Sequence, residues 1–154
     1  MKISTEDSLL LWRGYKEYYG EELMPSSVSF EAFVKSIEAQ TEITMEVYSK
    51  KGDCIITSNI AEFVSMPEGI IYATLVDDIS MAPHYSINMI VTRNKKPKEL
   101  FALLHKLKEL YFQYNQLPVF IEAYSDVMVK RFLREIKEEQ GLTVRKLGST
   151  FIVS

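Results

Sequence analysis

The sequence has little cysteine and little histidine. Its one cysteine, Cys54, has no partner in the chain for a disulfide, and two histidines are too few to complete a Cys/His zinc site. Cys54 is therefore interpreted as a small apolar residue of a strand, since free cysteine is among the most buried residue types. These absences argue against a disulfide-stapled scaffold and a zinc module, and no bound metal is expected.

Long apolar runs are also missing. No stretch approaches the ~20 apolar residues that a membrane-spanning helix needs. The chain turns acidic at Glu6 and Asp7, and the apolar run Leu9–Trp12 is too short for the core of a signal sequence. We therefore expect no membrane association and a cytoplasmic location.

The chain also has only a small excess of one sign of charge over the other. The 18 Lys and Arg residues against 21 Asp and Glu residues leave a net charge of −3. No broad positive field exists to hold a nucleic-acid backbone, so specific nucleic-acid binding is not expected. The 154 residues, 47% of them hydrophobic, fit one domain over residues 1–154 with a sizeable core.

What the sequence does have is clear periodicity. Apolar residues at helical spacing predict helices over 8–23 and 29–39, with Ser29 as N-cap of the second. Alternation from Thr41 onward predicts strands, with Pro67 and Gly69 in a loop between two of them. These strands are expected over residues 43–48, 54–57 and 70–76.

The second half of the chain alternates strands and helices. Residues 85–91 are mostly apolar, as in a strand buried on both faces. The strongest helical stripe runs from Leu100 through Leu110 to Tyr114, after Pro97 and before Asn115. Further elements are expected as a strand over 118–123, a helix from Ser125 or Asp126 to about Glu139 closed by Gly141, and strands over 142–144 and 150–153 on either side of a turn at Gly148.

This order of elements resembles the GNAT acyltransferase fold, most strongly over residues 85–154. The resemblance implies a mixed, mostly antiparallel central sheet flanked by helices on both faces. In that family a loop of the form Arg/Gln-x-x-Gly-x-Gly/Ala opens a helix and holds the pyrophosphate of acyl-CoA on its free amides. The corresponding segment here is Val91–Glu99, where Arg93 can stand for the leading residue, but every glycine is missing and Pro97 lacks an N–H.

Two interpretations of this segment stay open. The cluster of Arg93, Lys95, Lys96 and Lys98 can hold a phosphate by charge alone, with backbone amides of the strand over 87–92, where Val91 is a candidate cofactor contact, orienting the acyl carbonyl. It can equally be a solvated basic loop.

The resemblance also implies an Asn after the next strand and a Tyr acid on the next helix. Ser125 falls at the Asn position as a candidate cofactor contact, and Phe132 falls near the Tyr position, where it cannot donate a proton. Tyr124 is a candidate acid. Glu122 is a candidate base because it interrupts an apolar strand and would need a partner if buried.

Other acidic residues carry weaker signals. Glu42 and Glu46 lie on expected strands, where family members often keep a carboxylate base. Asp77, Asp78 and His84 have the residue types of a metal site, yet adjacent acids beside a loop are usually solvated.

Loss of the glycines and of the acid favours a catalytically degenerate GNAT-like protein that serves as a structural or interaction component without a cofactor. The pattern is similar to short GNAT-like proteins of tailed bacteriophages, some of which travel in the virion as internal or connector-associated components. That similarity implies protein partners, a homo-oligomer or ring, and a place in the virion besides the host cytoplasm.

Two alternatives from other classes stay open. One is an N-acetyltransferase that uses acetyl-CoA through a divergent phosphate loop. The other is a regulatory module whose basic loop binds a nucleotide or an acidic patch of a partner.

Overall fold

The computed structural model describes residues 4–23, 28–38, 58–78, 81–113, 117–122, 127–148 and 150–154. They form one six-stranded sheet of order β1-β2-β3-β4-β6-β5, in which only the β3–β4 pair is parallel. The elements are α1 (Thr5–Leu23), a helix over residues 30–38, β1 (Ser58–Met66), β2 (Gly69–Asp78), β3 (Met81–Thr92), α3 (Pro97–Leu107), the π-helix η1 (Lys108–Phe112), β4 (Val119–Glu122), α4 (Val127–Gln140), β5 (Val144–Leu147) and β6 (Thr150–Val153).

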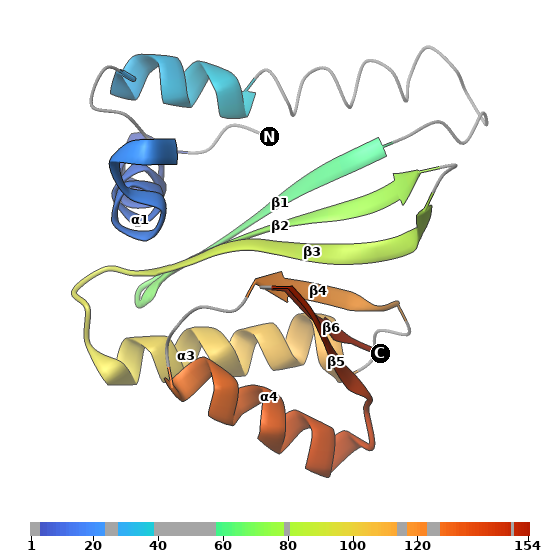
Figure 1. Cartoon of the computed structure of the whole chain (residues 1–154). Helices are drawn as coiled ribbons and strands as arrows, with labels where there is room; N and C mark the ends of the chain where they lie inside the picture. Colours follow the sequence, from blue (N-terminus) through green and yellow to red (C-terminus); the bar gives the residue numbers. More distant parts are fainter. Residues whose placement is uncertain are drawn as a thin grey trace.

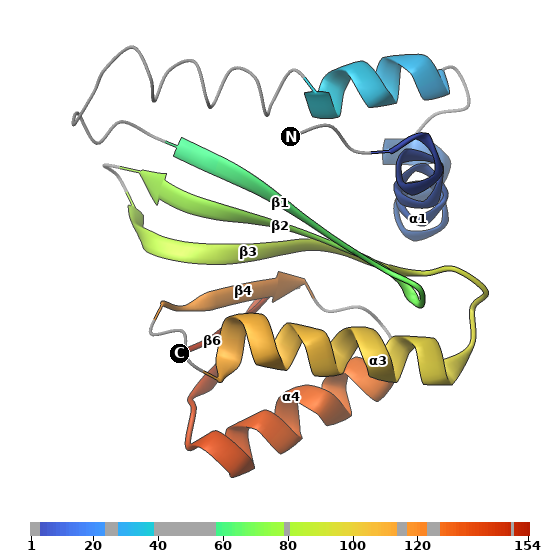
Figure 2. The same ribbon diagram turned by 180° about the vertical axis from the view of Figure 1, so that it is seen from behind.

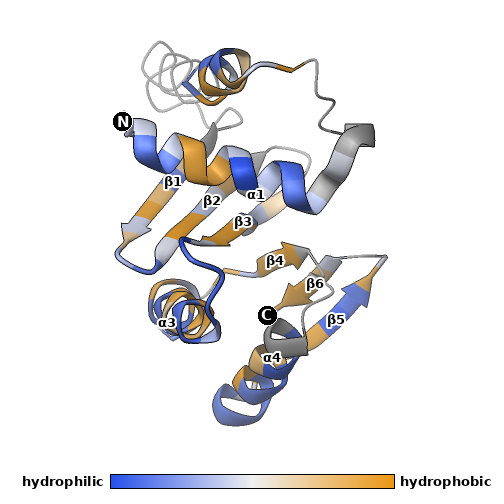
Figure 3. Cartoon of the chain, turned by 90° about the vertical axis from the view of Figure 1, so that its left-hand side faces the viewer, coloured by the Kyte–Doolittle hydropathy of each residue, from blue (hydrophilic) through white to orange (hydrophobic). Residues whose placement is uncertain are grey.

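Helices cover both faces of the sheet (Figure 1). Figure 3 shows α1 on one side of the sheet and α3 with α4 on the other, and Figure 2 shows α3 and α4 side by side. Each face has its own apolar cluster, because strand residues alternate between the two faces. The fold is therefore a mixed α/β fold, as the sequence predicts, and its sheet is mostly antiparallel.

Both N-terminal helices are confirmed, the second with its expected cap. Helix α1 begins earlier than predicted, at Thr5, and the hydroxyl of Ser4 accepts the Asp7 N–H at 3.1 Å. The Ser29 hydroxyl accepts the Ala32 N–H at 3.1 Å, as predicted for an N-cap. Helix α1 can lie close to β3 because Gly14 has no side chain: a Cβ there would be 2.4 Å from Cγ2 of Val91.

Strand β1 was not predicted. Its residues face both clusters, with Phe63 packed against the α1 side and Val64 against the α3 side, so no alternation marks it in the sequence. The strands expected over 43–48 and 54–57, with Cys54, Glu42 and Glu46, lie outside the described residues. The predicted strand over 70–76 is confirmed within β2.

Strand β3 contains the predicted strand over 85–91 and carries a β-bulge. Tyr72 of β2 lies opposite Met89 while the next residue, Ala73, lies opposite Ile87, so Asn88 is the extra residue. The bulge inverts the alternation of side chains along the strand. Ile87 is buried on the α3 side, whereas Met89, two residues later, is buried on the α1 side. Both faces are thus buried, as the apolar run predicts.

The predicted long helix changes type before its end. Helix α3 passes into η1, where the N–H of Gln113 bonds the carbonyl of Lys108 at 2.9 Å. The extra residue in that turn brings Tyr111 and Phe112 into the core together and leaves Leu110 43% exposed. The prediction that Leu110 belongs to the inner stripe is therefore wrong, because it assumed a constant period of 3.6.

The C-terminal elements follow the predicted order. Gly141 and Gly148 have φ of 63° and 62°, which suits the predicted helix end and the predicted turn. Strand β5 begins at Val144, so the strand expected over 142–144 is shifted toward the C-terminus. Strand β4 sits between β3 and β6, which joins the two halves of the sheet.

Candidate functional site

The loop from Arg93 to Glu99 joins β3 to α3, and a carboxylate of the chain itself fills it. One oxygen of Glu99 accepts the backbone N–H groups of Asn94 at 2.9 Å and Lys96 at 3.1 Å. The other oxygen accepts the side-chain amide of Asn94 at 3.0 Å. Glu99 is only 6% exposed. The backbone amides of Asn94 and Lys96 are therefore already bonded to an anion.

Glu99 is held in its charged form by these contacts. Burial by itself raises the pKa of its carboxyl, but the hydrogen bonds from the Lys96 and Asn94 backbones, the Asn94 side chain and the Lys96 charge outweigh burial. The net result is a pKa below the ordinary value of 4.5. No role in the site was predicted for Glu99 from the sequence. Its position at N3, one turn into a helix entered through Pro97, was the available signal.

Arg93 is a structural clamp in this arrangement. Its guanidinium donates to the carbonyl of Met66 at 2.9 and 3.0 Å and to the hydroxyl of Ser65 at 3.3 Å. It also pairs with Asp7 at 3.1 Å and Glu6 at 3.5 Å. One side chain thus ties the β1–β2 turn and the start of α1 to the end of β3.

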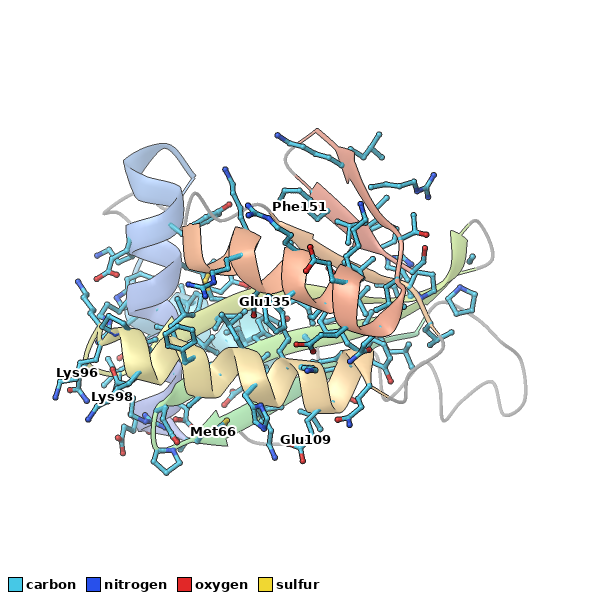
Figure 4. All side chains as sticks on the ribbon, turned by 90° about the horizontal axis from the view of Figure 1, so that it is seen from below. Met66, Lys96, Lys98, Glu109, Glu135 and Phe151 are labelled. Atoms are coloured by element: carbon cyan, nitrogen blue, oxygen red, sulfur yellow. The ribbon has the colours of Figure 1, made fainter. Side chains whose placement is uncertain are left out.

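The lysines of the loop divide into one paired and two exposed residues. Lys95 has φ of 57° and pairs with Glu17 of α1 at 2.8 Å. Lys96 and Lys98 are exposed, and Figure 4 shows them at the outer end of α3. Of the predicted basic cluster, Arg93 and Lys95 are therefore neutralised by α1.

Helix α1 also hydrogen-bonds the backbone carbonyl groups at the end of β3. The guanidinium of Arg13 donates to the carbonyl of Arg93 at 3.0 Å and to the carbonyl of Thr92. Val91 is buried beneath α1 against Gly14, and a Cβ on Gly69 would lie 2.0 Å from the Val91 carbonyl oxygen. The candidate cofactor contact Val91 therefore lies in the packing between α1, β2 and β3.

The remaining predicted site residues lie near the end of β4. Glu122 pairs with Thr150 of β6, and its side chain is outside what the structure describes. Tyr124 and Ser125 lie outside the described residues. Phe132 lies near the position where the resemblance implies a proton donor. It is 9% exposed, and its ring packs edge-on against that of Phe112, with 6.0 Å between the ring centres. Phe132 is therefore a core residue.

A second polar cluster was not predicted from the sequence. The hydroxyl of Tyr111, on η1, donates to Glu62 of β1 at 2.6 Å, and the ring of Tyr85 lies 5.0 Å from that of Tyr111. Burial, the hydrogen bond and the charge of Glu62 raise the pKa of Tyr111 far above its ordinary value. Burial and the charge of Glu62 also raise the pKa of Tyr85. Glu62 lies in β1, a strand that was not predicted, and the π-turn that brings Tyr111 to it was not predictable from spacing.

The weak metal hypothesis gains no support from the described residues. Among them no group of three or more His, Cys, Asp or Glu residues could hold a metal ion. His84 is buried, its Nδ1 lies 2.9 Å from the carbonyl of Ala82, and its ring stacks on Phe120. The side chains of Asp77 and Asp78 are not described.

Comparison of the chain with protein-family models, with curated proteins and with solved structures found no match. Within the described part of the chain, no helix is both long and apolar enough to cross a membrane. The chemistry of the site therefore rests on the contacts above.

Proposed function

We propose that this chain is a catalytically degenerate GNAT-like protein that acts as a structural or interaction component of a larger assembly. The order of its elements supports the resemblance: antiparallel strands β1 to β3 are followed by a helix, β4, a second helix and two final strands. The setting that the resemblance implies is a bacteriophage virion, with the chain as an internal or connector-associated component.

One observation carries this proposal: the carboxylate of Glu99 occupies the amides of Asn94 and Lys96. A coenzyme diphosphate in that loop needs the same N–H groups, and it would place its negative charge against a buried carboxylate. Pro97 removes a third donor. The loop is therefore not only crowded by the side chains that stand in place of glycines, because Glu99, the residue that follows them, bonds its amides.

The residue that an acyltransferase would use as its general acid is also missing at the predicted position. Phe132 has no proton to donate to a leaving thiolate and is packed against Phe112. Tyr111 is protonated and already bonded to Glu62, on another part of the sheet. These contacts support a role in which no bond of a substrate is broken.

An interaction role is supported by apolar side chains that the fold leaves at the surface. Five large hydrophobic residues among those described are exposed: Leu9, Tyr18, Phe101, Leu110 and Leu147. They lie on α1, α3, η1 and β5, so they offer contacts in more than one direction. A protein inside a homo-oligomer, a ring or a mixed assembly would cover such residues.

The test is a calorimetric titration of the protein with acetyl-CoA. The proposal predicts no saturable heat, because Glu99 already bonds the amide pair of Asn94 and Lys96. The variant Lys98→Ala serves as the control for non-specific attraction, since it removes an exposed charge and leaves Glu99 and its partners in place. Saturable micromolar binding that survives in the control would refute the inert-scaffold account.

The second candidate is an acetyl-CoA-dependent N-acetyltransferase, and one feature favours it. The parallel pairing of β3 with β4 ends at Ile87 and Ile121, immediately before the bulge at Asn88. In the described residues, β3 beyond the bulge has no β4 partner, so its backbone could orient an acyl carbonyl, with Glu122 as base. Release of free coenzyme thiol from acetyl-CoA with an added amine, lost in Glu122→Gln, would establish this function.

A further inference from the structure

A group of exposed cations, which we call the basic edge, lies on α4 and β5, apart from the loop and the polar cluster described above. Its members are Lys130, Arg134 and Lys137 of α4 and Arg145 and Lys146 of β5. The three residues of α4 follow one another at spacings of four and three, so they form one stripe along the helix. Lys146 lies over the ring of Phe151, which Figure 4 labels, with 6.0 Å from its nitrogen to the ring centre.

The stripe on α4 lies on the flank of that helix away from α3. Phe132 packs against Phe112, and Glu139 pairs with Lys108, so these α4 residues mark the flank that faces α3 and η1. Arg134 lies on the opposite flank, at about 3.6 residues per turn. Figure 3 shows α3 on one side of α4 and β5 on the other. The stripe and β5 therefore belong to one continuous surface.

The basic edge is not neutralised by the part of the chain that the structure describes. Glu135 of α4 pairs with Arg131 at 3.1 Å. Glu139 of α4 pairs with Lys108 of η1. Glu138, the remaining acid of α4, is exposed and forms no ion pair with a described residue. None of the five cations of the basic edge has an ion-pair partner among the described residues either. Their charge is available to a partner.

Strand β5 also has an open backbone edge. It is the last strand of the described sheet and pairs there only with β6. Thr143 and Ser154 exchange both of their backbone hydrogen bonds, at 2.7 and 2.9 Å. Because hydrogen-bonded and non-hydrogen-bonded pairs alternate along antiparallel strands, Val144 and Lys146 point their N–H and C=O groups away from β6. The edge therefore offers backbone donors and acceptors beside unpaired cations.

We propose that the basic edge binds an extended acidic segment of a partner protein, which adds to the sheet as a strand beside β5. The backbone of the segment bonds Val144 and Lys146, and its carboxylates face the five cations. The four residues of β5 extend about 13 Å. The α4 stripe extends about 10 Å from Lys130 to Lys137. One short segment is therefore long enough to contact both.

An acidic protein segment fits this edge better than other partners. In a second copy of the chain, two β5 strands would bring Arg145 and Lys146 against like charges, which is how edge strands avoid pairing with each other. A nucleic acid has no peptide groups for the open backbone of β5. Leu147, which is 70% exposed at the end of β5, can pack against an apolar side chain of a protein segment. This inference rests on the proposed interaction role and names the chemistry of one partner.

The first test is fluorescence anisotropy with a short labelled peptide of alternating Glu and Val residues. Saturable binding to the wild type is expected, and it should weaken as salt is added. The double variant Arg134→Glu with Lys137→Glu should bind at least about tenfold more weakly, because like charges then face each other. The matched control is Lys35→Glu with Lys98→Glu, which makes the same change of charge at exposed positions on other helices and should bind as the wild type does. All four positions are exposed, so neither variant should lose its fold.

The second test separates the backbone of β5 from its charge. Lys146→Thr removes the charge and keeps the outward N–H, whereas Lys146→Pro removes both. Proline is tolerated on an edge strand where the N–H points to solvent, so the β5–β6 pairing should persist. Lys146→Pro should therefore bind the peptide several-fold more weakly than Lys146→Thr, with similar thermal midpoints. Equal binding by these two variants would show that no strand is added to β5.

Three further results would overturn the proposal. The first is no saturable binding of the peptide, and the second is an equal loss of binding in the two double variants. The third is a single-stranded oligonucleotide that binds the wild type more tightly than the peptide does, which would make the partner a nucleic acid. These failures are distinct from failure of the proposed function. A protein that binds neither the peptide nor acetyl-CoA disproves the docking edge and leaves the inert-scaffold account standing, whereas one that binds both does the reverse.

Discussion

Two glycines show how single atoms fix the packing around β3. A Cβ on Gly69 would lie 2.0 Å from the backbone oxygen of Val91, which cannot move without breaking the β2–β3 pairing. A Cβ on Gly14 would lie 2.4 Å from Cγ2 of Val91, a side-chain atom that can rotate or shift. The two contacts are similar in length but different in consequence.

We therefore predict that Gly69→Ala lowers the free energy of unfolding by about 3 kcal/mol or more, at the upper end of the cost of overpacking. Gly14→Ala should cost about 1–2 kcal/mol. Gly141→Ala is the control: it has φ of 63° and no atom within 4 Å, so only backbone strain of about 1 kcal/mol applies. Urea unfolding monitored by circular dichroism measures all three. Equal losses in Gly14→Ala and Gly69→Ala would contradict the distinction.

Tyr111 couples stability to alkaline pH. Its pKa is raised in the folded state, so the stability it contributes is fully present below the ordinary value of 10.0 and is lost as pH rises above that value. Tyr111→Phe leaves Glu62 without its donor and should cost about 1–3 kcal/mol at pH 8. Because the variant cannot lose a proton there, the gap between the two proteins should narrow above pH 10. A constant gap from pH 8 to pH 11 would contradict this assignment.

At the scale of elements, hydrogen bonds and ion pairs fix the loop between β3 and α3 to the segments around it. Glu99 bonds its amides, Arg93 ties it to the β1–β2 turn, and Lys95 and Arg13 join it to α1. Helix α1 is therefore held against the sheet by apolar contacts and by ion pairs at the same place. The loop is occupied from within, which accounts for why a basic segment need not bind a phosphate.

Glu99 gives this unit a dependence on acid. Its pKa is lowered on folding, so its contribution is present above the ordinary value of 4.5 and is lost as pH falls through the lower, folded value. Glu99→Gln should lower the thermal midpoint at pH 7, and the difference from wild type should shrink below pH 4.5. Lys98→Ala, an exposed neighbour, should change the midpoint little at either pH. A Glu99→Gln protein as stable as the wild type at pH 7 would show that the carboxylate is not bound in the loop.

At the scale of the whole molecule, periodicity alone predicted much of the fold. The helices, β2, β3, β4 and β6 follow from apolar spacing, and the caps at Ser29 and Gly141 follow from residue type. Strand β1 did not follow, because apolar residues on both of its faces leave no alternation in the sequence. The bulge at Asn88 and the π-turn at Lys108 did not follow either, since each is one extra residue that only tertiary packing stabilises.

The candidate site was less predictable than the fold. The sequence places Arg93 and Lys95 in one loop but does not say which charges face them. Those charges come from α1, about eighty residues earlier in the chain. The missing glycines were visible in the sequence, whereas the carboxylate that fills the loop was identified only from its contacts.

The most direct measurement of the central claim is a heteronuclear NMR titration that follows the backbone N–H signals of Asn94 and Lys96 as acetyl-CoA is added in excess. If Glu99 already bonds both amides, neither signal should move with a saturable dependence on ligand. Saturable shifts of both signals would mean that the diphosphate displaces the carboxylate, and the account of an inert, self-occupied loop would be wrong.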